Sequence, residues 1–354
     1  MNERHADRIS ERFSEIVSGT GKGDILVAIF NTAPFLNVLA GVELRDYYMN
    51  VREKLRVQLR FQDAFPDFFC FPGIWADYGA LGEPSAFGCN IEWPESGFPM
   101  AQPVLKSMGD VASLKPIDPL KDGLMPKALE EFQYMWDHLD HRYMEEYGYL
   151  EGVAMSFGPV ELAAVIMGYG DFYLNLRAKP EQMHGLLEIT TESVLRWLKA
   201  QEKINGRLKR IGIADHVPGQ ISQEHFEEFW LPYSNRVVEE FPAATIIYHN
   251  EYPVPYLDAL AAFKFHVWHF GGELAPAKAA LGTHRTLMGN LHPIHVLLQG
   301  SPEEIYEKAL ACLKEGATGG RFLLSSGGGL APDTPIKNLK SLESAWKHFM
   351  RGED

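Results

Sequence analysis

The stretch TIIYHNEY, residues 245–252, joins an apolar, β-branched run to a His-x-Glu pair. β-Branched residues favour strands, and residues two apart in a strand point to the same face. His249 and Glu251 would therefore present an imidazole and a carboxylate to the same side, at the end of a buried strand. The predictions of fold and site both start from this combination.

Seven other short apolar runs resemble this one, and each is followed by a helical pattern. Several are apolar throughout, as expected for parallel strands that are covered by helices on one face and by packed side chains on the other. The eight runs are DILVAIF (24–30), DFFCF (67–71), YLEGVAMS (149–156), KRIGIA (209–214), ATIIYH (244–249), FHVWHF (265–270), RTLMGN (285–290) and RFLLSS (321–326). Eight strands alternating with helices predict an α/β fold, a closed (β/α)8 TIM barrel.

The chain contains no Ser/Gly linker and no break in composition, so we expect one domain over residues 1–354. Helix boundaries are clear in SPEEIYEKALACLKEG, where Ser301 and Glu304 have the spacing of a capping box. Residues 72–125 are rich in Pro and Gly and show little periodicity. We expect this segment to be a structured excursion that covers the barrel mouth.

The composition excludes several classes of function. The 33 Lys and Arg against 47 Asp and Glu give a net charge of -14, which is the wrong sign for nucleic-acid binding. The three cysteines, Cys70, Cys89 and Cys312, show no CxxC spacing, which favours a reducing, cytoplasmic setting. The start of the chain has no apolar signal core, and no later segment has the length of a membrane span. We therefore expect a soluble protein that binds neither nucleic acid nor a membrane.

Polar residues gather where the predicted strands end. In a barrel of this type the functional groups lie at the C-terminal ends of the strands. The five sets are Asp215-His216, His249-Asn250-Glu251, His269 with Glu273, Asn290 with His292, and the run from Ser325 to Gly329. Five neighbouring strands thus direct polar or ionisable groups to one mouth.

A histidine and a carboxylate aimed together suit zinc or another borderline metal. His269 and Glu273 would complete a shell around His249 and Glu251, although Glu273 is slightly better explained as a charge at the start of the helix that follows it. We interpret the remaining strand histidines, His266 and His284, as structural.

Other features allow two interpretations each. Asp215 ends an apolar strand, where it would meet either substrate or a neighbouring loop. The SSGGG run would either place backbone N–H groups against an anion or bulky cofactor, or form a tight turn. Trp75 and Tyr78 would either line a pocket for a planar substrate or pack their own segment down. GTGKGD (19–24) precedes a strand and lacks the spacing of a phosphate loop, so we exclude it.

Three segments resemble the uroporphyrinogen decarboxylase superfamily in order and spacing: GIADHVPGQISQEHFEEFWLPY (212–233), GNLHP (289–293) and LLSSGGGLAPDTPIKNLKSLESAW (323–346). Residues 47–67 also resemble the second helix and strand of that family, more weakly. The resemblance implies a (β/α)8 barrel, in agreement with the strand count.

The superfamily holds two chemistries. Porphyrinogen decarboxylases carry an arginine-rich segment after the first strand and a histidine in the C-terminal glycine-rich motif. This chain has NTAPFLNVLAG (31–41) and Gly327-Gly328 at those places. In the cobalamin-dependent methyltransferases the usual zinc ligands are His-x-Cys and a second cysteine. His249 matches the histidine, but Glu251 and a glycine replace the cysteines. The resemblance therefore implies a methyltransferase with a harder metal site, suited to an ether oxygen.

The sequence-based hypothesis is a corrinoid-dependent methyltransferase of the O-demethylase type. It would move a methyl group from a small methoxylated, aromatic donor to the Co(I) cobamide of a partner corrinoid protein. The residues assigned to it are His249, Glu251 and Asp215 in catalysis, Trp75, Tyr78, His216, Asn290, His292 and Ser326 in substrate binding, and His249, Glu251 and His269 as zinc ligands. Two alternatives remain: a decarboxylase with an unusual substrate, and a metal-free binding protein on the same barrel.

Overall fold

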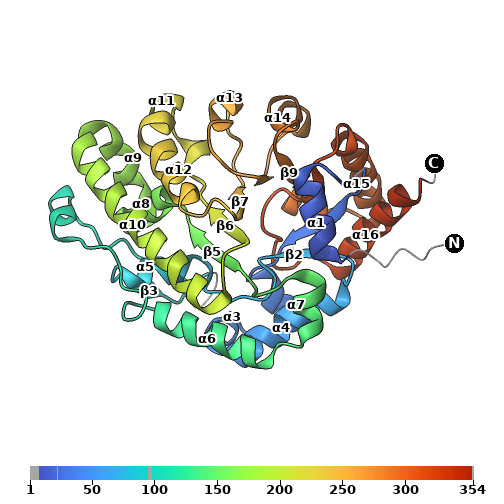
Figure 1. Cartoon of the computed structure of the whole chain (residues 1–354), viewed down its shortest axis with the longest axis horizontal. Coiled ribbons are helices and arrows are strands. Elements are labelled where there is room, and N and C mark those ends of the chain that lie inside the picture. The colour runs from blue at the N-terminus through green and yellow to red at the C-terminus, as the bar shows by residue number, and fades with distance from the viewer. Residues whose placement is uncertain (1–7, 22, 95–97, 353–354) are drawn as a thin grey trace.

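Eight parallel strands form a barrel in the computed structural model, which describes residues 8–21, 23–94 and 98–352 (Figure 1). The strands are β1 (Leu26–Phe30), β2 (Phe69–Phe71), β5 (Val153–Phe157), β6 (Arg210–Ala214), β7 (Thr245–Asn250), β8 (Val267–Phe270), β9 (Thr286–Leu291) and β10 (Phe322–Ser326). Each coincides with one of the eight predicted runs. The predicted (β/α)8 barrel is confirmed, and the carboxyl ends of its strands share one mouth.

Helices surround the strands (Figure 1). The N-terminal half contains α1 (Ile9–Ser18), α2 (Phe35–Ala40), α3 (Leu44–Met49), α4 (Val51–Ala64), α5 (Gly82–Ala86), α6 (Met125–His138), α7 (His141–Tyr147), α8 (Pro159–Met167), α9 (Tyr169–Ala178) and α10 (Pro180–Asn205). The C-terminal half contains α11 (Gln223–His225), α12 (Leu231–Glu239), α13 (Leu257–Leu260), α14 (Leu274–Leu281), α15 (Pro302–Ala317) and α16 (Ile336–Arg351). Short 3-10 or π turns are η1 (Gly79–Leu81), η2 (Met108–Ser113), η3 (Val217–Gln220), η4 (Phe226–Trp230) and η5 (Pro293–Leu298). The predicted capping box of Ser301 and Glu304 is present at α15.

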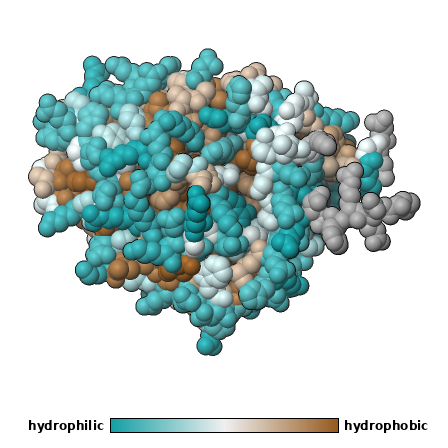
Figure 2. Space-filling model, viewed as in Figure 1, coloured by the Kyte–Doolittle hydropathy of each residue, from teal (hydrophilic) through white to brown (hydrophobic). Residues whose placement is uncertain are grey.

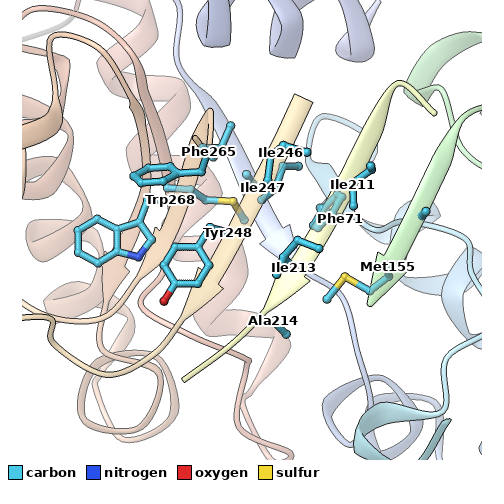
Figure 3. Packing of buried hydrophobic residues seen from close by; sticks show 14 of the residues in the cluster. Phe71, Met155, Ile211, Ile213, Ala214, Ile246, Ile247, Tyr248, Phe265 and Trp268 are labelled. Atoms are coloured by element: carbon cyan, nitrogen blue, oxygen red, sulfur yellow. The ribbon is translucent and has the colours of Figure 1, made fainter. Parts of the chain in front are cut away.

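Apolar side chains fill both faces of the sheet, because parallel strands are buried on both sides. Figure 3 shows this packing around β5–β8, where Ile213, Ile247 and Trp268 belong to the buried core. A Cβ at Gly212 would lie 2.3 Å from Met155 Sδ and 2.6 Å from Phe71 Cζ. Phe71 of β2 and Met155 of β5 therefore meet over β6 inside the barrel.

The sheet order is β2-β1-β10-β9-β8-β7-β6-β5, so no backbone ladder joins β2 to β5 among the described residues. Side chains satisfy the free edge of β5 instead. The Gln201 side chain accepts from Met155 N–H at 3.1 Å and donates to its carbonyl at 3.0 Å. Asn205 donates to the Val153 carbonyl, and Phe157 N–H donates to Glu83. We call this gap between β2 and β5 the seam. Because polar side chains of other elements occupy the edge of β5, the ring of strands is open at the seam, whereas a closed barrel was predicted.

The ring of Tyr149 packs beside the end of β2. Gly73 has φ +91°, and a Cβ there would lie 2.0 Å from the Tyr149 ring. Only glycine tolerates both this backbone conformation and this close approach. Tyr149, which precedes β5, also donates to Gln62 of α4, the helix before β2.

The predicted excursion, residues 72–125, contains η1, α5, η2 and a small antiparallel pair, β3 (Ile91–Glu92) and β4 (Met100–Ala101). Its role as a cover for the whole mouth stays a prediction. The first seven residues of the chain lie outside the described part. None of the described helices is both long and apolar enough to cross a membrane. On the face in Figure 2, hydrophilic residues dominate and hydrophobic residues form separate groups.

Candidate active site

A cavity of about 350 Å³ opens at the carboxyl ends of the strands, in the size range of small-molecule sites. Its wall is mostly apolar, and no lysine or arginine of the described chain lines it. The lining residues are Phe30, Thr32, Ala33, Trp75, Ala76, Tyr78, Gly79, Ala80, Gly82, Glu83, Met125, Ala128, Phe132, Met155, Ser156, Phe157, Trp197, Gln201, Ala214, His216, His249 and Glu251. The lining residues of the described chain therefore offer no lysine or arginine to a ligand with several negative charges.

His249 and Glu251 lie on the same side, as their spacing predicts. His249 Nε2 is 3.6 Å from Glu251 Oε1. His216, just after the adjacent strand β6, joins them, and one potential ligand atom from each of the three lies within 4.8 Å of the others. The structure thus assembles two imidazoles and a carboxylate at one place in the cavity.

A chain of hydrogen bonds orients His249. His269 Nε2 lies 2.9 Å from the Ser326 carbonyl, so it must carry the hydrogen. His269 Nδ1 then accepts, and His249 Nδ1, at 2.9 Å, donates to it. The Nε2 lone pair of His249 is left facing the cavity. Burial lowers the pKa of His249 well below its usual value, and the nearby His269 and His216 lower it further. The neutral ring suits metal binding.

Glu161 at the start of α8 orients His216. Its Oε2 accepts from His216 N–H at 2.7 Å, and its Oε1 lies 3.5 Å from His216 Nδ1. Burial raises the pKa of Glu161, but the hydrogen bonds and charge of His216 outweigh it and the net shift is downward. Burial lowers the pKa of His216, but Glu161 outweighs it and raises the pKa overall. A carboxylate behind a metal-binding imidazole is a frequent arrangement.

The glycine run holds Glu251. Gly329 N–H donates to Glu251 Oε1 at 2.7 Å. A Cβ at Gly328 would lie 2.8 Å from the same carboxylate, closer than real contacts allow. The anion that the run receives is therefore a side chain of the protein itself, Glu251.

Two residues that were assigned to the site from the sequence, His269 and Asp215, do not line the cavity. His269 cannot serve as the predicted metal ligand in this arrangement, because the Ser326 carbonyl and His249 engage both of its ring nitrogens. Asp215 is fully buried and does not line the cavity, so of its two interpretations, substrate or a neighbouring loop, the structure favours the contact with neighbouring backbone. It accepts from the N–H groups of Glu161 and Val217. Burial, together with the charge of Glu161, raises its pKa well above the usual value.

Three predicted substrate-binding residues also lie outside the cavity wall. Asn290 donates to the Gly272 carbonyl, and the Ser326 hydroxyl donates to the Gly328 carbonyl. His292 accepts from two N–H groups at the start of η5. Their hydrogen-bonding groups serve the local backbone, which a strand-end position alone does not reveal. Trp75, Tyr78 and His216 do line the cavity.

Glu273 occupies the N-cap position of α14, but its side chain makes no capping hydrogen bond. His266 accepts from Ile246 N–H at 3.0 Å and is structural, as expected. Glu83, Ser156 and Glu161 were not predicted from the sequence. Glu161 follows β5 by only four residues, which is a detectable signal, whereas Glu83 comes from the irregular segment and shows none.

The fold and the site together define a (β/α)8 barrel with a polar cluster at the carboxyl ends of its strands, where barrels of this type carry their chemistry. Residues 34–349 match the uroporphyrinogen decarboxylase (URO-D) family. The chain belongs to that family, and the resemblance seen in its sequence is confirmed.

Two kinds of protein are similar to the chain: uroporphyrinogen decarboxylases and a methyltransferase. A uroporphyrinogen decarboxylase of Prochlorococcus marinus (strain MIT 9303) is 26% identical over 319 residues, 84% of this chain and 85% of that protein. A methylated-thiol–coenzyme M methyltransferase of Methanosarcina mazei is 22% identical over 274 residues, 75% of this chain and 69% of that protein. The solved structure of a methyltransferase from Methanosarcina mazei has the same fold, with a TM-score of 0.81, 21% identity and coverage of 97% and 99% of the two chains.

Proposed function

We propose that this protein is a corrinoid-dependent methyltransferase of the O-demethylase type. It takes a methyl group from a small methoxylated aromatic donor and passes it to the Co(I) cobamide of a partner corrinoid protein. The observation that carries the proposal is the meeting of His216, His249 and Glu251 at one place in a largely apolar cavity. The methyltransferase names among the relatives support the same class.

The difficulty of the reaction is the leaving group. A phenolate leaves poorly unless its negative charge is stabilised as it forms. The methyl carbon forms a bond to cobalt while its bond to the ether oxygen breaks. Cobalt provides the electron pair of the new bond and passes formally from Co(I) to Co(III). The electron pair of the broken bond stays on the oxygen, and the resulting phenolate takes up one proton from solvent.

Two imidazoles and a carboxylate fit a zinc ion, since catalytic zinc sites commonly use three protein ligands of these types. When bound, zinc would polarise the ether oxygen as a Lewis acid. His269 fixes the ring of His249, and Glu161 fixes that of His216. None of the three cysteines lines the cavity. Nitrogen and oxygen ligands favour an oxygen-containing donor over a thiol.

The wall of the cavity supports an aromatic donor. Phe30, Trp75 and Phe132 contribute aromatic surface. Aromatic side chains pack favourably on planar rings. Because no lysine or arginine of the described chain lines the cavity, a porphyrinogen with many carboxylates would find no strong cation there, which disfavours the decarboxylase alternative.

Methyl transfer tests the proposal directly. The purified protein is mixed with reduced corrinoid protein and a panel of methoxyarenes, methylated thiols and methanol, and formation of the methylcobamide is followed by its absorption spectrum. We expect turnover with a methoxyarene, release of one phenol per methyl group, and loss of turnover in His249→Ala. Preference for a methylated thiol would contradict the assignment, and so would carboxyl loss in a separate incubation with a porphyrinogen.

Metal analysis separates the enzyme from the binding-protein alternative. Protein prepared without chelator should contain close to one zinc per chain, and His249→Ala should lose it. Full metal content in His249→Ala would place the metal elsewhere. A wild-type protein with neither metal nor turnover would favour a metal-free binding protein.

A further inference from the structure

The cavity continues beyond the barrel interior. Met155 and Ser156 are neighbours in β5 and therefore point to opposite faces of the sheet, yet both line the cavity. Met155 meets Phe71 inside the barrel. On the other side of β5 the wall is formed by Phe132 of α6 and Trp197 of α10. We call this outer part, reached through the seam, the seam arm of the cavity.

Two polar side chains of the seam arm keep hydrogen-bonding capacity. Glu83 is 7% exposed, and its Oε1 accepts from Phe157 N–H at 3.0 Å. The Ser156 hydroxyl is 2% exposed and close enough to influence the pKa of Glu83, but no described residue meets it with hydrogen-bond geometry. A buried hydroxyl without a partner is rare, so Ser156, beside the Glu83 carboxyl, calls for a ligand group.

The chemistry of the pair restricts that group. A carboxylate or phosphate would face Glu83 in a wall without lysine or arginine, and a methyl group would leave both polar side chains unpaired. Burial raises the pKa of Glu83, with the Phe157 N–H as the main opposing influence. The Glu83 carboxyl can accept a hydrogen bond, and the Ser156 hydroxyl can donate one. A neutral group that both donates and accepts, such as a hydroxyl, satisfies Glu83 and Ser156 together.

The position of the pair sets the length of the ligand. β5 and β7 are separated only by β6, so Ser156 and His249 lie two strand spacings apart, about 10 Å along the sheet. A molecule of the size of methanol or methylamine cannot contact both places. A ring with substituents at opposite ends can.

We propose that Glu83 and Ser156 form a binding site for a hydroxyl group on the end of the methyl donor remote from its methoxy group. The donor class is thus a hydroxylated methoxyarene. The identity of the donor rests on the proposed function, but the hydroxyl site can be tested without methyl transfer.

The test compares 4-methoxyphenol with methoxybenzene, which differ only in the hydroxyl. Trp75 and Trp197 line the cavity, so binding to the whole chain can be followed by tryptophan fluorescence without a corrinoid protein. We expect the wild type to bind 4-methoxyphenol about tenfold more tightly. Ser156→Ala and Glu83→Leu should bind the two compounds equally, because the hydroxyl then loses a partner.

Stability distinguishes a ligand site from a structural one. Because the Ser156 hydroxyl has no partner in the described structure, Ser156→Ala should melt at a temperature no lower than that of the wild type. Glu83→Gln can still accept from Phe157 N–H and should keep at least a third of the preference, which covers the case that Glu83→Leu does not fold. Glu130→Gln, an exposed change on α6, is the matched control and should keep the full preference.

Equal binding of both compounds by the wild type, or an unchanged preference in Ser156→Ala, would overturn the proposal. A preference that depends on Ser156 in a protein without methyl transfer would support the hydroxyl site and contradict the proposed function alone. Methyl transfer from methoxyarenes with no preference for a hydroxyl group would support the proposed function and contradict the hydroxyl site.

Discussion

At the scale of single residues, the pairing of His249 with another histidine is the feature with most consequence for the site. A carboxylate partner would place a negative charge behind the ring, whereas His269 is neutral and buried: burial lowers its pKa to about 4, despite its bond to the Ser326 carbonyl. His269 therefore orients His249 without adding charge, and it is a positioning residue.

Replacing His269 should weaken zinc binding without removing a residue that lines the cavity. We expect His269→Phe to lower zinc affinity by 10- to 100-fold, the usual effect of losing a partner behind a metal-binding imidazole. His269→Gln, which can both donate and accept, should recover part of this loss. Metal affinity is measured by competition with a chelator, with the exposed His284→Ala as control. Equal affinities in His269→Phe and wild type would show that His249 needs no such partner.

The charge of Glu251 should influence methyl transfer more than donor binding. Glu251→Gln keeps an oxygen for Gly329 N–H, so the geometry is retained and only the charge is lost. We expect kcat to fall by about 100-fold and the donor Kd to change by less than threefold, because the effect is on the developing phenolate and not on the resting ether. Kinetics and fluorescence titration measure the two quantities. Equal losses in rate and binding would mean that Glu251 holds the donor itself.

At the scale of elements, the turn after β10 determines where the Glu251 carboxylate lies. Gly327, Gly328 and Gly329 differ in how close an added methyl group would come to it. At Gly328 the Cβ would be 2.8 Å from Glu251, and at Gly329 it would be 3.5 Å away, an ordinary contact. Neither glycine has a backbone conformation that excludes alanine.

We expect Gly328→Ala to displace the Glu251 side chain and to lower methyl transfer at least tenfold, while thermal stability stays close to that of the wild type because Glu251 is partly exposed and can move. Gly329→Ala, one position further along the same turn, should keep nearly full activity. The comparison requires only initial rates and melting temperatures. A stronger effect at Gly329 than at Gly328 would contradict the role given to this turn.

The sequence predicts the strands well because parallel strands buried on both faces appear as continuous apolar runs. It also predicts the His249–Glu251 pair, which depends only on the two-residue period of a strand. It cannot predict the seam. Several side chains distant in sequence satisfy the β5 edge there. Gln201, for example, lies 46 residues from Met155, and no periodicity in the sequence marks it.

The sequence indicated His269 as the third member of the cluster and assigned His216 to substrate binding, whereas the structure places His216 beside His249 and Glu251. Both follow or end apolar strands that neighbour β7, one on each side. The difference is made by what lies behind each ring: Glu161 for His216 and a backbone carbonyl for His269. Such contacts are set by the packing of α8 and β10 and have no local signature.

At the scale of the whole molecule, the three cysteines report on the integrity of the barrel. All are buried, and burial raises the pKa of Cys70 to about 12 and those of Cys89 and Cys312 to about 11. Thiolate, the reactive form, is scarce below these pKa values and increases as pH rises toward them. The native protein should therefore show almost no reaction with a disulfide reagent at pH 8, and three thiols should react in denaturant. One fast thiol in the native protein would reveal a local opening.

The seam has a consequence for how this barrel can change over generations. In a fully laddered barrel, altering the interior volume means substituting residues on strands that also hold the ring together. Here Ala128 of α6 and Trp197 of α10 border the cavity but contribute no backbone hydrogen bond to the sheet. Substitutions at these two helices can lengthen or shorten the chamber while every strand pairing is retained. One set of residues therefore determines which molecules the cavity admits, and another set stabilises the barrel. Selection can change the first set without changing the second.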